Sequence, residues 1–396
     1  MYNEKCYQLG AQPNGIRKLF AYGLQKAKEI GPENVFDYSI GNPSIPSPAK
    51  VNESICDIVN TEDSIKVHGY SMSVGFDDVR DSIAADLSSR CGLSIKGSSL
   101  FLTCGAAPAL LAVIKALCVE ETSEIVILAP FFPEYVPFTV YNGGVPVIVP
   151  PDMKAFQIDA AQVESYLTPN TQAVIVNSPN NPSGVVYSEE TLKSLADLLT
   201  RKSEEYGHPI YIISDEPYRE LVYGGVVVPF LPCIYKNTIV CYSYSKSLSL
   251  PGERIGYVYV PEFADDAADV YLAIAGAARA SGHICPPTLF QKVVGRCASE
   301  RPDLEAYDKN RILLYEALTE IGYNCVKPDG AFYLFVKAPG GDSIAFSERA
   351  KLGYNLLLVP ADAFGCPGYV RLSYAVSNDM IHRSLPAFRE LLKEYV

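Results

Sequence analysis

Thr238-Ile-Val-Cys-Tyr-Ser-Tyr-Ser-Lys246 is an apolar, β-rich run that ends in two serines and a lysine. Arg254 follows eight residues after the lysine, in Gly-Glu-Arg-Ile-Gly. An amine among two hydroxyls and a guanidinium can form an imine beside a bound phosphate, because hydroxyl and guanidinium groups both donate to phosphate oxygens. We therefore expect pyridoxal phosphate here, with Lys246 as the anchoring amine and Ser243, Ser245 and Arg254 around the phosphate. The alternative, a solvated surface lysine, does not account for the neighbouring serines and arginine.

Runs of the same apolar kind recur along the chain and alternate with helical patterns. Such alternation predicts a mainly parallel sheet, and nearly continuous apolar runs indicate that helices cover both of its faces. We expect seven strands, at Leu100–Thr103, Glu124–Leu128, Val145–Val149, Ala173–Asn177, Ile210–Ser214, Thr238–Tyr242 and Ile255–Val260. Because open α/β sheets bind ligands beyond the carboxyl ends of their strands, the polar residues that follow these runs form the candidate site.

The two ends of the chain show a different pattern. An amphipathic stretch from Ile16 to Leu24 predicts a helix, and a turn-rich segment begins at Gly41. After Pro286, long polar helical patterns surround short β-rich runs at 331–336 and 369–374. The sequence therefore predicts an α/β fold with a large domain at 45–285 and a smaller α+β domain at 286–396, to which the helix and arm of 1–44 also belong.

Composition and charge exclude several classes of protein. The formal net charge is −12, which disfavours nucleic acid as a partner because binding to it depends on lysines and arginines that neutralise phosphates. The polar start and the lack of an apolar run of about 18 residues predict a cytoplasmic protein that neither crosses nor binds a membrane. The eleven cysteines and four histidines have no ligand-like spacing, so we expect reduced thiols and no metal.

Asp215 directly follows a predicted strand, in Ser-Asp-Glu-Pro-Tyr218. A buried carboxylate at this place can keep the pyridine nitrogen of the cofactor protonated, which makes the ring an electron sink. Tyr218 is then a candidate donor to the phenolic oxygen of the ring. The alternatives are a helix N-cap for Asp215 and a packed aromatic for Tyr218.

Three further segments follow predicted strands and offer cofactor contacts. Asn181 lies in a Pro- and Gly-rich loop that can present its amide to the phenolic oxygen, although an ordinary turn has the same composition. Phe132 can stack on the ring or simply pack. A second phosphate cradle is predicted where a strand meets a helix and small residues let backbone N–H groups approach an anion, at Gly105, Ala106 and Ala107.

Arg371 lies in an otherwise apolar run, Tyr369-Val-Arg-Leu-Ser-Tyr374. A buried guanidinium is costly unless it meets an anion, and a substrate α-carboxylate can pair with it through two parallel hydrogen bonds. The alternative is a structural ion pair with one of the 45 acidic residues of the chain. We predict Arg371 as the substrate carboxylate site.

Taken together, these motifs resemble the class I/II aminotransferases, which are pyridoxal phosphate enzymes of fold type I related to aspartate aminotransferase. The resemblance covers nearly the whole chain and includes the helix that begins near Ile16 and the loop Ser39-Ile-Gly-Asn-Pro. It rests on the order and spacing of Tyr70, Gly75, Gly105-Ala-Ala, Asn181-Pro-Ser-Gly, Asp215-Glu-Pro-Tyr218, Ser243-x-Ser-Lys246, Arg254 and Arg371.

The resemblance implies a transamination by double displacement, in which an amino group passes between an L-amino acid and a 2-oxo acid. Lys246 would be both the covalent anchor and the general base. Gly41, Asn181 and Arg371 would contact the substrate. Family members are homodimers, and Tyr70 matches the tyrosine that reaches the phosphate bound by the partner subunit.

The substrate and one rival activity stay open at this stage. Ala107 stands where some prokaryotic aspartate aminotransferases have lysine. This difference disfavours aspartate and 2-oxoglutarate as the substrates, and neutral or aromatic amino acids stay as the other candidates. Arg279 could contact a distal carboxylate or be a surface charge, and Tyr333 and Phe20 would line the pocket by analogy. A cystathionine-type carbon–sulfur lyase of the same fold shares the cofactor motifs, so these motifs do not distinguish it. A transcription regulator with this fold would need a DNA-binding segment, and the N-terminal part has neither the length nor the basic charge for one.

Overall fold

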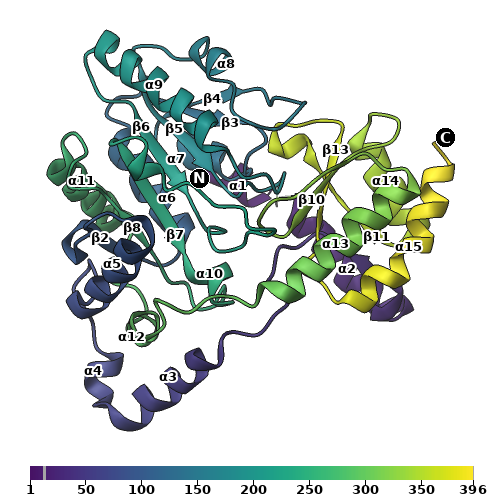
Figure 1. Ribbon diagram of the computed structural model, residues 1–396, viewed down its shortest axis with the longest axis horizontal. Helices are drawn as coiled ribbons and strands as arrows, with labels where there is room; N and C mark the ends of the chain where they lie inside the picture. The colour runs from purple at the N-terminus through teal and green to yellow at the C-terminus, as the bar shows by residue number, and fades with distance from the viewer. Residues whose placement is uncertain (12–14, 396) are drawn as a thin grey trace.

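The largest element of the computed structural model, which describes residues 1–11 and 15–395, is a seven-stranded sheet (Figure 1). The strand order is β2-β8-β7-β6-β5-β3-β4. All neighbours are parallel except β8, which is antiparallel to both β2 and β7. The predicted strands and their order along the chain are confirmed, with bounds β2 (Leu100–Thr103), β3 (Glu124–Leu128), β4 (Val145–Val149), β5 (Thr171–Asn177), β6 (Tyr211–Asp215), β7 (Thr238–Ser243) and β8 (Gly256–Tyr259).

Helices cover both faces of this sheet, which explains why its strands are apolar on both sides. In β3, Ile125 and Ile127 pack with α6 and α11, while Val126 and Leu128 point to the opposite face and pack with α9. Helices α5 and α12 cover the second face over β2, β7 and β8. The helices of this large unit are α3 (Ala49–Thr61), α4 (Ser64–His68), α5 (Asp77–Cys91), α6 (Ala106–Leu117), α7 (Tyr135–Tyr141), α8 (Ala160–Glu164), α9 (Glu189–Tyr206), α10 (Tyr244–Ser247), α11 (Ala267–Ala280) and α12 (Thr288–Arg296).

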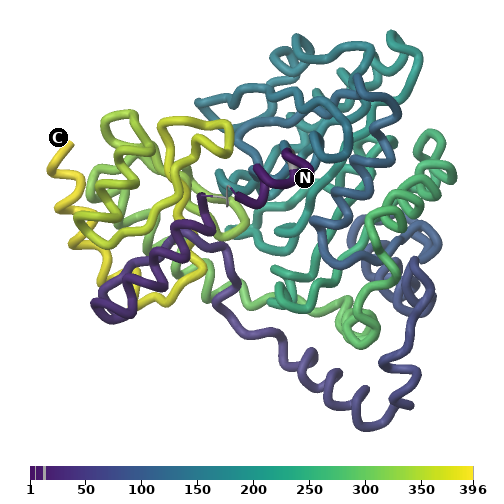
Figure 2. Tube along the Cα trace, turned by 180° about the vertical axis from the view of Figure 1, so that it is seen from behind, coloured from purple at the N-terminus to yellow at the C-terminus, as the bar shows by residue number. Residues whose placement is uncertain are grey.

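A smaller unit holds helix α2 and the C-terminal end of the chain, while the N-terminal helix α1 extends from it toward the large unit (Figure 2). Its four-stranded antiparallel sheet has the order β12-β13-β10-β9, and a parallel pair joins β1 to β11. The predicted strand runs at 331–336 and 369–374 are present as the central pair of this sheet. The helices and strands of this unit, with α1 (Glu4–Ala11) preceding them, are α2 (Gly15–Ile30), β1 (Phe36–Asp37), α13 (Leu304–Ile321), β9 (Cys325–Val326), β10 (Tyr333–Lys337), α14 (Ser343–Tyr354), β11 (Leu356–Leu357), β12 (Val359–Pro360), β13 (Tyr369–Ser373) and α15 (Asn378–Lys393).

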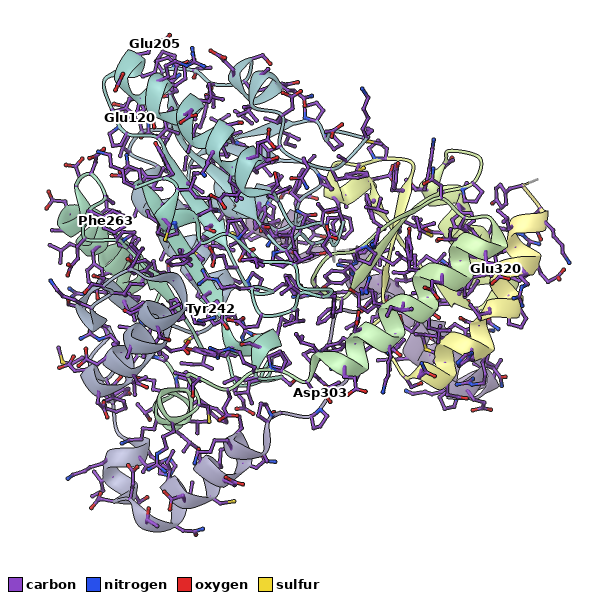
Figure 3. The ribbon with its side chains drawn as sticks, viewed as in Figure 1. Glu120, Glu205, Tyr242, Phe263, Asp303 and Glu320 are labelled. Carbon is purple, nitrogen blue, oxygen red and sulfur yellow. The ribbon has the colours of Figure 1, made fainter. Side chains whose placement is uncertain are left out.

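The chain passes between the two units twice. Helices α3 and α4 extend away from the body after the first crossing, and α13 begins next to Asp303 at the second and runs toward Glu320 on the far side (Figures 1 and 3). Helix α12 follows the predicted domain boundary near Pro286, yet its Val293 and Val294 pack in the core of the large unit. The division at 44 and 285 stays a prediction, and this packing favours a second boundary closer to residue 300.

The topology brings the ends of β5, β6 and β7 side by side. Asn177 pairs in register with Asp215, and Asp215 pairs with Cys241, which lies two residues before the Ser243-Tyr-Ser-Lys246 motif. Because parallel strands end at the same edge, the predicted site residues gather there although they are far apart in sequence.

Within the described residues, no helix is long and apolar enough to cross a membrane.

Candidate active site

A cavity of about 370 Å³ lies at the carboxyl edge of the large sheet, where residues of the smaller unit face it. All predicted site residues line this cavity except Gly105, which borders it through Arg254, and Tyr70. The lining residues are Ile16, Ile40, Gly41, Ala106, Ala107, Leu110, Phe132, Asn177, Asn181, Asp215, Pro217, Tyr218, Ser243, Ser245, Lys246, Pro251, Arg254, Tyr333 and Arg371.

Lys246 lies on the short helix α10, which begins directly after β7 because the Ser243 hydroxyl caps it and accepts from the Ser245 amide at 3.2 Å. The Lys246 Nζ donates to the carbonyl oxygen of Gly41 at 2.6 Å, so the helix of one unit and the loop of the other meet at this amine. Burial lowers the pKa of Lys246 to about 8, with further contributions from the positive charges of Arg371 and Arg254. A substantial fraction of the amine is therefore neutral and nucleophilic near pH 8.

Asp215 ends β6 and is only 4% exposed. Its Oδ2 accepts a hydrogen bond of 2.5 Å from the Tyr135 hydroxyl, while Oδ1 is buried and has no hydrogen-bond partner within the described part of the chain. Burial raises the pKa of Asp215 to about 7, and the Tyr135 hydrogen bond opposes this shift. No helix begins at Asp215, so the N-cap alternative does not apply. The carboxylate has one oxygen free for a donor that enters the cavity.

A cluster of donors surrounds the first turn of α6. The Ser243 and Ser245 hydroxyls lie 2.7 Å apart, and the Arg254 Nη1 lies 3.4 Å from the Ser245 Oγ. Gly105, at the N-cap of α6, has φ +92°, and a Cβ there would lie 2.7 Å from the Arg254 Nη2. Only glycine combines this backbone with the close approach of the guanidinium. Together with the N–H groups at the start of α6, these residues can hold a phosphate.

Tyr218 and Tyr333 form a buried pair in one wall of the cavity. Their hydroxyl oxygens lie 2.9 Å apart, and their rings meet edge to face with centroids 5.7 Å apart. The backbone of Gly41 packs so closely on the Tyr333 hydroxyl that any side chain at position 41 would collide with it. Gly41 thus fixes the distance between the loop and this wall.

Arg371 is 3% exposed, on β13, and faces the cavity. Its Nη1 donates to the Asn181 Oδ1 at 3.0 Å and its Nη2 to the Ser39 carbonyl oxygen at 2.6 Å, while the Tyr333 ring centroid lies 4.5 Å from its Cζ. Both nitrogens meet neutral oxygens, and in residues 1–11 and 15–395 no carboxylate contributes to its charge environment. The alternative of a structural ion pair therefore does not apply, and the guanidinium can take a carboxylate ligand.

The structure also brings in residues that the sequence analysis missed. Tyr135 contacts Asp215, and Ser39 contacts Arg371. Apolar walls come from Ile16, Ile40 and Leu110. Tyr135 lies three residues after Phe132, a spacing that could have indicated that both side chains lie near the same site. The other contacts are not marked by any motif or spacing in the sequence.

Three residues named from the resemblance lie outside this cavity. Tyr70 follows α4 and is 87% exposed. Arg279 is exposed in the last turn of α11, and Phe20 is exposed on α2, whose Ile16 lines the cavity instead. The expectation that Phe20 forms a pocket wall is therefore wrong for the cavity of its own chain.

A sequence model of the family described as "Aminotransferase class I and II" matches residues 33–388. The chain belongs to this family. The match spans both units and every strand of the large sheet, and the expected α/β architecture of fold type I is confirmed.

Named relatives and solved structures agree with this assignment. The aminotransferase is 32% identical to the "Probable aspartate/prephenate aminotransferase" of Aquifex aeolicus, over 93% of this chain and 94% of the relative. It is 29% identical to the "Aromatic-amino-acid aminotransferase 2" of Thermococcus litoralis, over 96% of both chains. An amino transferase structure from Eubacterium rectale is 52% identical with a TM-score of 0.98, over 100% of this chain and 99% of the other. The aspartate aminotransferase of Thermus thermophilus with maleate is 27% identical with a TM-score of 0.87, over 99% of both.

The residues of this aminotransferase fit pyridoxal phosphate. The free Asp215 Oδ1 suits a protonated ring nitrogen, the clustered donors of Ser243, Ser245 and Arg254 suit a phosphate, and the Lys246 amine lines the same cavity. Among the described residues, Asp215 Oδ1 has no hydrogen-bond partner, while Lys246 and Arg254 donate only to uncharged oxygens, of Gly41, Ser245 and Pro251. Across the described residues, no three His, Cys, Asp or Glu side chains gather as metal ligands.

Proposed function

We propose that this protein transfers an amino group between an L-amino acid and a 2-oxo acid, with pyridoxal phosphate held at Lys246. One observation carries the proposal: a buried lysine amine and a buried carboxylate with one free oxygen line the same cavity of a class I/II aminotransferase chain. The relatives named above are all aminotransferases, so the carbon–sulfur lyase alternative gains no support.

When bound, pyridoxal phosphate supplies an electron sink that stabilises negative charge at the substrate α-carbon. The side chains of this chain would hold it and move the proton. Lys246 would take the α-proton on Nζ and return it to the cofactor, since its lowered pKa suits a general base. The phosphate would be bound by Ser243, Ser245, Arg254 and the backbone of Gly105, Ala106 and Ala107. Asp215 would bind the ring nitrogen, Tyr218 and Asn181 the phenolic oxygen, and Phe132 would stack on the face of the ring. The substrate would contact Gly41, Asn181 and Arg371.

A spectral titration tests the activity. Purified protein loaded with pyridoxal phosphate is mixed with single amino acids without a 2-oxo acid, and the visible absorption band of the cofactor is followed while released ammonia is assayed. An aminotransferase loses the band stoichiometrically and recovers it when a 2-oxo acid is added. Continuous ammonia release with an unchanged band would contradict the proposal and indicate a lyase.

The same titration tests the class of substrate. The cations that line the cavity are Lys246, Arg254 and Arg371, and each has a proposed role. The remaining walls include Ile16, Ile40 and Leu110, and one buried apolar side chain contributes about 1.5–3 kcal/mol. We therefore propose that donors with neutral, apolar side chains react at lower concentration than aspartate, by roughly tenfold or more. A preference for aspartate that disappears in Arg279→Ala would instead assign Arg279 of a second subunit to a distal carboxylate.

We also propose a homodimer in which Tyr70 contributes to the site of the other subunit. Apolar side chains around Tyr70 are exposed, with Met72 at 73% and Ile284 at 63%, and His283 Nε2 lies 2.9 Å from the Ser73 carbonyl oxygen, which joins the two segments. An exposed apolar patch of this kind marks an interaction site.

Mixed dimers test the role of Tyr70. Lys246→Ala subunits have no anchoring amine, and Tyr70→Phe subunits should bind cofactor roughly tenfold more weakly because one hydrogen bond to a phosphate is lost. At limiting cofactor, exchanging subunits between the two variants should restore activity, since a mixed dimer then holds one complete site. No recovery, with mixed dimers shown by mass spectrometry, would mean that Tyr70 does not act across an interface.

A further inference from the structure

Tyr135 is the only residue whose side chain is seen to hydrogen-bond the Asp215 carboxylate within the described ranges. It begins α7 and is 1% exposed, with its ring in the core between the large sheet and the helices α6 and α11. Its ring also meets Phe132 edge to face, with centroids 5.7 Å apart. The tyrosine is thus packed in the core and does not line the cavity, and its hydroxyl contacts a residue that does, Asp215.

This contact divides the carboxylate into two different oxygens. Oδ2 receives the tyrosine hydroxyl, and Oδ1 is left buried and free. The backbone is fixed as well, because the Asn177 Nδ2 donates to the Asp215 carbonyl oxygen at 2.9 Å. A carboxylate held at one oxygen and at its backbone can present the other oxygen in only a narrow range of directions.

We infer that Tyr135 is a positioning residue that orients Asp215 and stabilises its carboxylate, so that Oδ1 is presented to the ring nitrogen of the cofactor. The inference rests on the proposed function, since it assigns a ligand to Oδ1. Tyr135 touches neither substrate nor cofactor in this scheme and acts only through Asp215.

The electrostatics of the pocket agree with this role. The titratable groups that face Asp215 are Tyr135 on α7, Tyr218 after β6 and Cys241 on β7, and burial raises the pKa of all three. They are therefore neutral at pH 7, and Asn177 on β5, which donates to the Asp215 carbonyl oxygen, is an uncharged amide. The Tyr135 hydroxyl lowers the pKa of Asp215 against the larger effect of burial. Its removal should raise that pKa above about 7, so that Asp215 is protonated over a wider pH range.

The test compares cofactor affinity in Tyr135→Phe and in a matched control. Tyr235→Phe removes a hydroxyl from another buried tyrosine, which donates to the Ile210 carbonyl oxygen at 2.7 Å outside the cavity. Apoprotein is titrated between pH 6 and 9 with pyridoxal phosphate and with its 1-deaza analogue, in which C–H replaces the ring nitrogen. A hydrogen bond to a charged group is stronger than one between neutral groups, so we expect roughly tenfold or greater loss of affinity for pyridoxal phosphate in Tyr135→Phe.

Two further results distinguish positioning from packing. The affinity of wild-type protein should fall as the pH falls through the pKa of apo Asp215, because a protonated carboxyl cannot pair with the ring nitrogen; in Tyr135→Phe this fall should begin at higher pH. Affinity for the 1-deaza analogue should change little. In an Asp215→Asn background, Tyr135→Phe should cause no further loss.

The inference is overturned if Tyr135→Phe binds pyridoxal phosphate as wild type does, or if it loses both ligands equally at every pH. Should Tyr135→Phe fail to fold, 3-fluorotyrosine at position 135 keeps the shape and makes the phenol a stronger donor, so the pH midpoint should move down; an unmoved midpoint refutes the role. Failure of the proposed function is a separate result: the wild-type protein would then bind neither ligand, or would bind pyridoxal phosphate and release ammonia continuously in the spectral titration.

Discussion

Replacing Lys246 by alanine is expected to lower the rate of transamination by about four orders of magnitude or more, because the variant loses both the anchoring amine and the general base. Folding should be unaffected, since within residues 1–11 and 15–395 the Nζ is seen to donate to one acceptor, the carbonyl oxygen of Gly41. The phosphate donors remain in place, so the variant should still bind pyridoxal phosphate, more weakly. Steady-state kinetics, equilibrium dialysis of the cofactor and thermal unfolding measure these three effects.

Lys236→Ala is the matched control, because Lys236 pairs with Asp265 on the surface and does not line the cavity. It should have wild-type kinetics. Borohydride reduction of the loaded enzyme should attach the cofactor to Lys246 in wild type and to no residue in Lys246→Ala. A Lys246→Ala enzyme that kept more than a hundredth of the wild-type rate would refute the proposed mechanism.

Arg371→Lys should raise the KM for the amino donor about ten- to a hundredfold while it changes the melting temperature little. A lysine keeps the charge but cannot reproduce two parallel hydrogen bonds to a carboxylate, and each hydrogen bond to a charged group contributes about 1.5–3 kcal/mol. The hydrogen bonds of Arg371 to Asn181 and Ser39 would also be altered, so the loop at Ser39 should become more mobile. Kinetics with one amino acid and with the amine that lacks its carboxylate measure the effect.

The amine serves as an internal control, since its reactivity should be the same in both enzymes if Arg371 binds the α-carboxylate. Arg349→Lys is the external control, because Arg349 pairs with Glu394 on the surface. If Arg371→Lys leaves KM unchanged, or lowers the reactivity of the amine as much as that of the amino acid, Arg371 is not the carboxylate site.

The strands of the large sheet could be predicted from the sequence to within two residues. The reason is local: a strand that helices cover on both faces needs apolar side chains on both faces, as in Glu124–Leu128, and the polar residues that follow mark where it ends. The reversal of β8 against β7 was not predicted, since the apolar run of an antiparallel strand buried on both faces looks the same.

The candidate site could be predicted where a reactive side chain comes at or just after the end of a strand, as at Asp215 and Lys246. It was not predictable where two distant segments meet. Tyr135 reaches Asp215 across 80 positions of sequence, and Arg371 reaches Ser39 across 332. No periodicity or spacing carries such pairings, because they depend on how segments that are distant in the sequence pack together within each folded unit.

The sequence by itself determined the fold class, the residue types at the strand ends and their resemblance to class I/II aminotransferases. Those properties follow from local apolar patterns and from motifs a few residues long. Only the tertiary structure decided how the same groups behave. Burial lowers the pKa of Lys246 to about 8 and raises that of Asp215 to about 7, and it leaves one oxygen of Asp215 without a partner among the described residues. Charge stabilisation depends on the solvent and dipoles around a group, and the packed chain alone sets these.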